Sequence, residues 1–272
     1  MVPHPGEKEL LLEFERRVLP EHYKTYYLIK RNNFFASVQA FPEIWECFCL
    51  IDEAWIREFQ DMERASDPYK GFAMLLFCSA HSKMRTSFEL ALSACVTEAH
   101  SILRDAIEAF AHGYRIQAEP KLLEVWLNKI DGPQERRAYE REFWENKSSG
   151  LFKGLGDLYG LWRQYSELGS HTSINSLAER FEQAETPTDV NWRFTYSGAK
   201  DEILARVLLA MICIFDSMEK YFFMAFEGRL KFDEALRRKR VEFQNRKEIV
   251  RMQIIKKYNI PPPTNATLHG TP

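Results

Sequence analysis

The sequence predicts an all-α fold, a bundle of several helices packed around one large hydrophobic core. Hydrophobic residues make up 45% of the 272 residues and include 20 Phe, 11 Tyr and 6 Trp, which is enough to build such a core. Gly and Pro number only 12 each, too few for the many tight turns of an all-β protein. Apolar residues recur every three or four positions along much of the chain, the spacing of one buried helix face.

In the N-terminal part, prolines separate three predicted helices. Residues 7–18 combine apolar and charged positions at helical spacing, and Pro20 follows them. A second helix is expected over 21–40 and a third over 43–64, because Pro42 cannot donate the backbone hydrogen bond that continues a helix. The third helix carries a stripe of large apolar side chains at steps of three and four: Trp45, Phe48, Ile51, Trp55 and Phe59.

The next segment contains no proline between Pro68 and Ile116. A single helix of this length would span roughly 70 Å, which is too long for a compact domain. We therefore expect a break near Ser79–Ser82 or near Ser93–Thr97, and an antiparallel pair of helices.

Shorter helices and one β-like stretch are expected further along the chain. Val190, Trp192 and Phe194 alternate with other residues, which predicts one short irregular or β-like hairpin near 188–198. The predicted helices of this part are 121–130, 134–146, 157–168, 172–182 and 200–227, of which the last is the most apolar.

The C-terminal region differs from the rest in charge. Residues 228–272 hold eleven Lys or Arg and four acidic residues, a net charge of +7, which leaves −9 for residues 1–227. Apolar residues recur every seven positions at Leu236, Phe243 and Val250. We predict a single helical domain over 1–227, a basic amphipathic helix over 228–259 and a disordered tail over 260–272.

The basic helix has two interpretations. Its cations are candidates for binding RNA or a protein partner through their positive charge. Alternatively, the helix folds back on the acidic domain and is otherwise solvated. The candidate residues are Arg237, Arg238, Lys239, Arg240, Arg246 and Lys247.

Several classes of protein are not expected. The longest apolar stretch, Val207–Phe215, is far shorter than the roughly 20 residues that span a bilayer, so no membrane association is predicted. The N-terminal sequence lacks the basic and apolar regions of a secretory signal, and the five cysteines form no CxxC pair. A cytoplasmic location is therefore expected. The seven His residues are scattered, with no HxxxH pair, so neither a metal nor a cofactor is predicted.

One predicted helix carries a polar face of potential functional interest. His100, Arg104, Glu108 and His112 are spaced four apart and therefore line one side of the helix. Such a face could hold a phosphate or an acidic ligand, with Arg104 binding it bidentately and Glu108 fixing the arginine. The alternative is a solvated face with ordinary ion pairs.

A second polar segment surrounds His171. This histidine follows Gly169, and Tyr165 and Ser166 supply hydroxyl groups nearby. Tyr165 is, together with His100 and Arg104, a candidate phosphate ligand. A histidine among arginine and hydroxyl groups could act as a general acid or base in metal-free phosphodiester cleavage near pH 7. The alternative is that His171 satisfies a buried carbonyl group beside a helix cap.

The two polar segments together resemble a known group of proteins. TEAHSILRDAIEAFAHGYRI and LYGLWRQYSELGSHTS, within about residues 71–180, resemble motifs of uncharacterised bacterial all-helical proteins that are compared with the HEPN type. HEPN-type bundles occur in toxin–antitoxin, abortive-infection and antiviral defence systems. The resemblance implies a HEPN-like core and a homodimer, with Arg104 and Glu108 matching the first motif and Ser166 and His171 the second. Catalytic HEPN ribonucleases carry a histidine four to six residues after an arginine, whereas seven residues separate Arg163 from His171 here.

Two functions follow from these patterns, and the sequence leaves open whether the chain is an enzyme. In the favoured hypothesis it is a non-catalytic helical adaptor or scaffold of a bacterial defence or stress system, with the polar residues joining helices and the basic helix docking a partner. In the alternative it is a metal-independent HEPN-like ribonuclease. Arg104 and Arg163 would then bind phosphate, Glu108 would orient a neighbour and His171 would transfer a proton.

Overall fold

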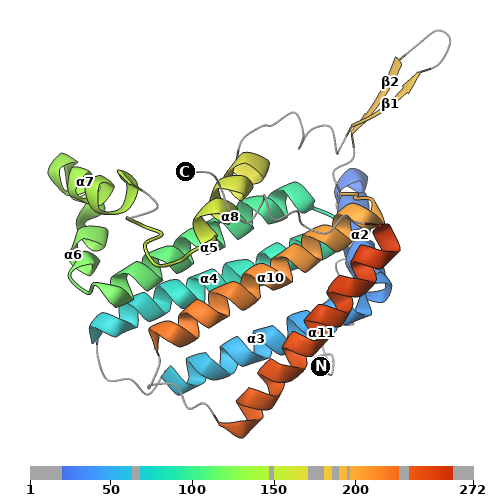
Figure 1. Cartoon of the computed structure of the whole chain (residues 1–272). Coiled ribbons are helices and arrows are strands. Elements are labelled where there is room, and N and C mark those ends of the chain that lie inside the picture. The colour runs from blue at the N-terminus through green and yellow to red at the C-terminus, as the bar shows by residue number, and fades with distance from the viewer. Residues whose placement is uncertain are drawn as a thin grey trace.

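Long helices that run side by side form the body of the molecule (Figure 1). The computed structural model describes residues 20–62, 68–146, 150–170, 181–185, 190–194, 197–226 and 233–259. Most residues in these ranges lie in helices, which confirms the predicted all-α bundle. The long helices of the body are α3 (Pro42–Met62), α4 (Pro68–Leu92), α5 (Val96–Ala118), α10 (Asp201–Ala225) and α11 (Glu234–Tyr258).

Helices α4 and α5 form the antiparallel pair that the sequence predicts. The break lies at the second of the two expected places, where Ala94 adopts a left-handed conformation with a φ of 57°. The Cys95 N–H donates to the Leu90 carbonyl at 2.8 Å, which closes the turn. Further along the pair, Gly113 allows a close approach, since a Cβ there would lie only 3.2 Å from the Ala73 carbonyl oxygen. The chain therefore reverses at Ala94 and Cys95, and the two helices approach closely at Gly113.

Aromatic side chains from α3, α4, α5 and α10 pack against one another in the core. Trp55 stacks on Phe222 with ring centroids 5.7 Å apart, and Phe77 meets Phe110 edge to face at 5.0 Å. All four side chains are fully buried. Each contributes about 1.5–3 kcal/mol relative to an exposed side chain. The predicted apolar stripe of α3 therefore faces the core, with Trp45 and Phe59 at its partly buried edges.

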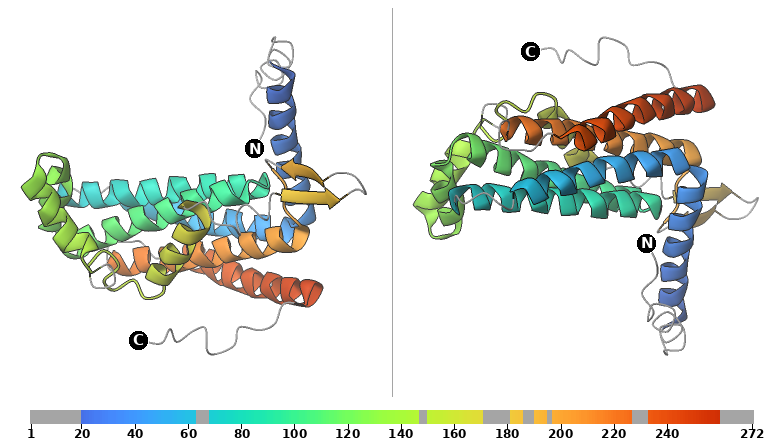
Figure 2. Two further views of the ribbon diagram at one scale, coloured as in Figure 1. Left: turned by 90° about the horizontal axis from the view of Figure 1, so that it is seen from above. Right: turned by 90° about the horizontal axis from the view of Figure 1, so that it is seen from below.

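Helix α2 (Glu21–Ala40) leaves the body almost at a right angle (Figure 2). It meets α3 at an angle of 95° at Pro42, and Ser37 is its one buried residue among those described. The Asn33 side chain donates to the Ser197 hydroxyl at 2.9 Å and ties the inner end of α2 to the start of the α10 segment. Within the described ranges no helix alone has the length and hydropathy to cross a membrane, although α2 and α3 taken together as a bent pair would pass by length and composition.

A segment of short helices covers one end and one side of α5. Arg115 of α5 is buried and anchors this segment by donating from Nε to the Gly150 carbonyl at 2.9 Å. The segment begins where Pro120 follows α5, and two of its turns widen to π-helix. Its elements are α6 (Leu122–Leu127), a 3-10 turn (Asn128–Ile130), α7 (Pro133–Tyr139), a π turn (Glu140–Trp144), α8 (Leu158–Tyr165) and a second π turn (Ser166–Ser170).

Two short strands extend beyond the helices (Figure 1). Strands β1 (Phe181–Glu185) and β2 (Val190–Phe194) pair antiparallel, with Gln183 opposite Trp192. The expected β-like stretch at 188–198 overlaps β2 but not β1. The helix expected over 172–182 falls almost entirely outside the described residues, and its last two positions belong to β1.

Helix α11 packs directly on α3 and α10. Asp233 caps its N-terminus by accepting the Leu236 N–H at 2.9 Å. Phe243, Val250 and Ile254 are buried and belong to the same continuous core as α3 and α10. The basic helix therefore covers the body rather than extending away from it, and residues 260–272 lie outside the described ranges.

Candidate functional site

The polar face of α5 and the end of α8 meet in one cluster. Arg104 Nε donates to Ser166 Oγ at 3.1 Å, Nη1 to Asp105 Oδ1 at 2.8 Å and Nη2 to Glu108 Oε2 at 3.1 Å. The structure thus brings together Arg104, Glu108 and Ser166, which are 62 residues apart at the widest. We call Arg104, Asp105, Glu108, Trp162 and Ser166 the Arg104 cluster.

Trp162 completes this cluster and was not singled out from the sequence. Its indole Nε1 donates to Glu108 Oε2 at 3.2 Å, and the Arg104 guanidinium lies 5.5 Å from its ring centroid. The Ser166 hydroxyl donates to the Trp162 carbonyl at 2.8 Å, so its oxygen is left to accept from Arg104. The polar groups of the cluster therefore satisfy one another.

The exposure of the cluster is intermediate. The Arg104 and Glu108 side chains are 26% and 25% exposed, so water reaches one side of the ion pair. Each of the three guanidinium nitrogens already donates a hydrogen bond to a side chain of the protein. These contacts use three of the five guanidinium N–H groups, so a phosphate bound by Arg104 would compete with Glu108 and Asp105.

The histidines at either end of the polar face are buried. Burial lowers the pKa of both His100 and His112 to about 4, so both are neutral near pH 7. His112 lies between the Glu108 carbonyl at 2.9 Å from Nδ1 and the Tyr139 hydroxyl at 2.9 Å from Nε2. Because a carbonyl only accepts, Nδ1 carries the proton and Nε2 accepts from Tyr139. Both ring nitrogens of His112 are therefore used within the fold.

His100 and Tyr165, the two remaining predicted phosphate ligands, contact each other in the core. Their ring centroids are 5.2 Å apart, and His100 is 8% exposed and Tyr165 5% exposed. Burial raises the pKa of Tyr165 to about 12, so the phenol keeps its proton. These positions weigh against the predicted contact with a phosphate in solution.

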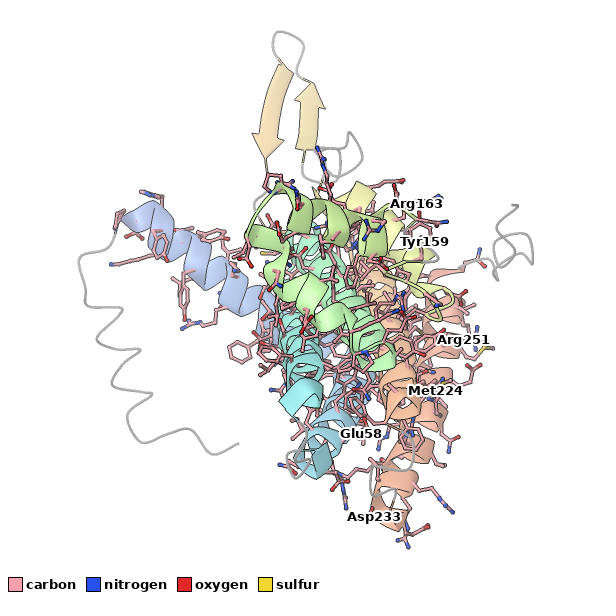
Figure 3. All side chains as sticks on the ribbon, turned by 90° about the vertical axis from the view of Figure 1, so that its left-hand side faces the viewer. Glu58, Tyr159, Arg163, Met224, Asp233 and Arg251 are labelled. Atoms are coloured by element: carbon pink, nitrogen blue, oxygen red, sulfur yellow. The ribbon has the colours of Figure 1, made fainter. Side chains whose placement is uncertain are left out.

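Of the other two predicted catalytic residues, one is described, and it lies apart from the Arg104 cluster. Arg163 follows Trp162 on α8 and is exposed (Figure 3). Among the described residues no hydrogen bond or ion pair links it to Arg104. His171 lies outside the described residues. The role of His171 in proton transfer therefore stays a prediction.

A second polar site lies where α3, α10 and α11 meet, and the sequence analysis missed it. Glu58 of α3 and Glu219 of α10 are 0% and 1% exposed, and Arg240 of α11 donates from Nη2 to Glu219 Oε2 at 2.7 Å. Burial raises the pKa of Glu58 to about 10, and the adjacent Glu219 raises it further in the same direction. At neutral pH Glu58 is therefore protonated. Burial raises the pKa of Glu219 as well, and the neighbouring Arg240 opposes that rise. We call Glu58, Glu219 and Arg240 the buried carboxyl pair with its arginine.

Asp216, one helical turn before Glu219, anchors α11 in the same way. It accepts from Gln244 Nε2 at 2.6 Å, from Lys220 Nζ at 2.9 Å and from Lys247. Burial raises its pKa, but the hydrogen bonds from the two lysines outweigh burial and hold that pKa below its ordinary value. Asp216 is therefore an ionised hub between α10 and α11.

The candidate basic residues of α11 divide into an inward and an outward group. Lys239 pairs with Glu53 of α3, and Arg246 pairs with Glu46 of α3, while Arg240 and Lys247 reach the carboxylates of α10. Arg237 and Arg238 are 61% and 79% exposed and pair with Glu234 on their own helix. Of the two interpretations of the basic helix, the observed packing is the one in which it folds back on the acidic body.

The sequence contains a signal for the missed site. Glu58 lies three residues after Trp55, and Glu219 lies three residues before Phe222, so both carboxylates occupy core positions of their helices. A carboxylate on a buried face requires a partner.

Metal binding finds no support in the described ranges, where no group of three or more His, Cys, Asp or Glu side chains is arranged to hold an ion. Comparison of the chain with protein-family models, with curated proteins and with solved structures gives no match.

Proposed function

We propose that this chain is a non-catalytic helical scaffold whose polar clusters fix its helices to one another. The single observation that carries the proposal is that all three nitrogens of Arg104 donate to side chains of the same molecule. An arginine committed in this way joins α5 to α8 and is not preorganised for a ligand.

The titratable groups beside the cluster support the same conclusion. A general acid or base needs a pKa near the working pH, and burial lowers the pKa of both His100 and His112 to about 4. Burial also removes both rings from contact with a substrate in solution.

The biological setting that we propose, bacterial defence or stress, depends on the HEPN-like resemblance of the two polar segments alone. So does the HEPN-like arrangement of the core. In this setting the scaffold presents the outer surface of α11 to a partner, since the inward cations of that helix are already paired with the body.

Alanine substitutions combined with an RNA cleavage assay test the proposal. Purified wild type, Arg104→Ala, Arg163→Ala and His171→Ala are incubated with total RNA in EDTA, and their thermal melting is recorded in parallel. We expect no RNA cleavage by any of them. Arg104→Ala should lower the melting temperature by several degrees, since its cluster contributes about 1–2 kcal/mol and 1 kcal/mol corresponds to about 2–4 °C in a chain of this size. Arg163→Ala is the matched control and should melt like the wild type, because its side chain is exposed.

The contrary result would favour the ribonuclease. If the wild type cleaves RNA without metal, and the alanine variants melt normally but do not cleave, the scaffold proposal is wrong. The catalytic set would then be the predicted one of Arg104, Glu108, Arg163, Ser166 and His171.

A further inference from the structure

The outer face of α11 carries a regular stripe that no described residue covers. Three large apolar side chains, Val241, Ile249 and Met252, are 56%, 57% and 54% exposed there. They lie opposite the buried face of the helix, and polar residues continue the stripe in both directions at steps of three and four. We call this stripe the outer seam, and its members are Glu234, Arg238, Val241, Asn245, Ile249, Met252 and Lys256.

The spacing of the outer seam is symmetric about Asn245. Val241 and Ile249 lie four positions on either side of it, and Glu234 and Lys256 lie eleven positions on either side. If a second copy packed antiparallel about a two-fold axis at Asn245, Val241 would face Ile249 and Glu234 would face Lys256. A parallel copy would instead bring Glu234 to Glu234 and Lys256 to Lys256. The charges of the stripe therefore favour the antiparallel arrangement.

The residues that flank the stripe permit this contact. With the axis at Asn245, Glu242 of one copy would approach Glu248 of the other copy, so that two acidic side chains would meet. Each is already paired along its own helix, Glu242 with Arg246 at 3.2 Å and Glu248 with Arg251 at 2.6 Å. These pairs reduce the repulsion between the two copies.

We propose that the outer seam is the contact between two copies of this chain, packed antiparallel through α11. The inference rests on the proposed function, in that it names a second copy as the partner of the scaffold. The seam from Glu234 to Lys256 is about 33 Å long at 1.5 Å per residue, long enough for a helix pair. Asn245 would hydrogen-bond its counterpart on the axis and fix the register, as a polar residue does in a coiled-coil seam.

The partner is a second copy rather than RNA because of the charge distribution. Four cations of α11, Lys239, Arg240, Arg246 and Lys247, pair with carboxylates of the body. The outer seam itself has apolar residues on both sides of its central Asn245, with Glu234 at one end and Lys256 at the other. Figure 2 shows α11 along the outer edge of the molecule, where a second helix has access to it.

Sedimentation velocity of the full chain over about a hundredfold range of concentration tests the proposal. The wild type should dimerise. Val241→Glu combined with Ile249→Glu should raise the dissociation constant at least about a hundredfold, because the centre of the contact then carries charge. The variant should still melt as a folded monomer, since both positions are exposed. Leu75→Glu on α4 is the matched control, because Leu75 is 64% exposed away from the seam, and this variant should dimerise like the wild type.

Charge reversals test the orientation. Glu234→Lys and Lys256→Glu should each weaken the dimer by about three- to tenfold, as rim charges do, and the double variant should recover the affinity. A wild type that stays monomeric, or a dimer unaffected by the Val241 and Ile249 substitutions, would overturn the inference. So would RNA binding that is lost when Arg237 and Arg238 are replaced by Ala. The dimer is measured by sedimentation and the scaffold proposal by RNA cleavage. Failure of the inference is therefore distinguishable from failure of the scaffold proposal.

Discussion

Two arginine–carboxylate clusters join helices in this molecule, and they differ in their access to water. In the Arg104 cluster, both the arginine and Glu108 are about a quarter exposed. In the buried carboxyl pair, Arg240 is 20% exposed but Glu219 is only 1% exposed. When an ion pair is broken at the surface, water replaces the lost partner, whereas a buried carboxylate stays uncompensated. The same chemical pair therefore has a different structural importance at the two places.

The largest effect is expected for Arg240→Ala. This change leaves the buried Glu219 carboxyl without its cationic partner, and we expect the free energy of unfolding to fall by about 3–5 kcal/mol. Urea unfolding at neutral pH measures the loss. Arg238→Ala on the same helix is the matched control and should change stability by less than about 0.5 kcal/mol, because its side chain is exposed. Equal effects of the two substitutions would show that an arginine paired with the buried Glu219 matters no more for stability than an exposed arginine.

The second prediction concerns pH and Glu58. Its pKa is raised from 4.5 to about 10, so between these values the folded chain binds a proton that the unfolded chain releases. The stability contributed by this proton is present in full below about pH 4.5 and decreases as the pH rises towards 10. The free energy of unfolding should therefore fall between neutral and mildly alkaline pH.

Glu58→Gln isolates this effect, since glutamine is neutral and of the same size. Urea unfolding at several pH values should show a shallower alkaline decrease in this variant than in the wild type. Glu43→Gln, an exposed position on the same helix, should keep the wild-type slope. An unchanged slope in Glu58→Gln would mean that Glu58 is ionised in the folded chain.

Much of the fold follows from patterns within single helices. The prolines locate the boundary between α2 and α3, and the excessive length of an unbroken helix predicts a reversal between α4 and α5. The sequence did not decide between the two places for that reversal, because Ser or Thr residues occur at both. The turn at Ala94 is fixed by backbone hydrogen bonds that local composition does not reveal.

The two arginine–carboxylate clusters also differ in how far their pairing can be predicted from the sequence. Arg104 and Glu108 are four apart on one helix, so their pairing is visible in the sequence. Glu58, Glu219 and Arg240 come from three helices, and 161 positions separate the first two. Their proximity depends on how α3, α10 and α11 pack, which the spacing within one helix does not specify. A carboxylate at a core position predicts that a partner exists but does not identify it.

The smallest effect concerns the hydrogen bond from Trp162 to Glu108 in the Arg104 cluster. Trp162→Phe keeps a buried aromatic ring but removes the indole N–H that donates to Glu108 at 3.2 Å. A double-mutant cycle with Glu108→Ala separates this bond from the change in packing. We expect a coupling energy of about 0.5–1.5 kcal/mol, since the acceptor is charged but partly solvated. Additive effects would show that the bond contributes nothing, and that α8 is held to α5 by Ser166 and by the packing of the indole ring alone.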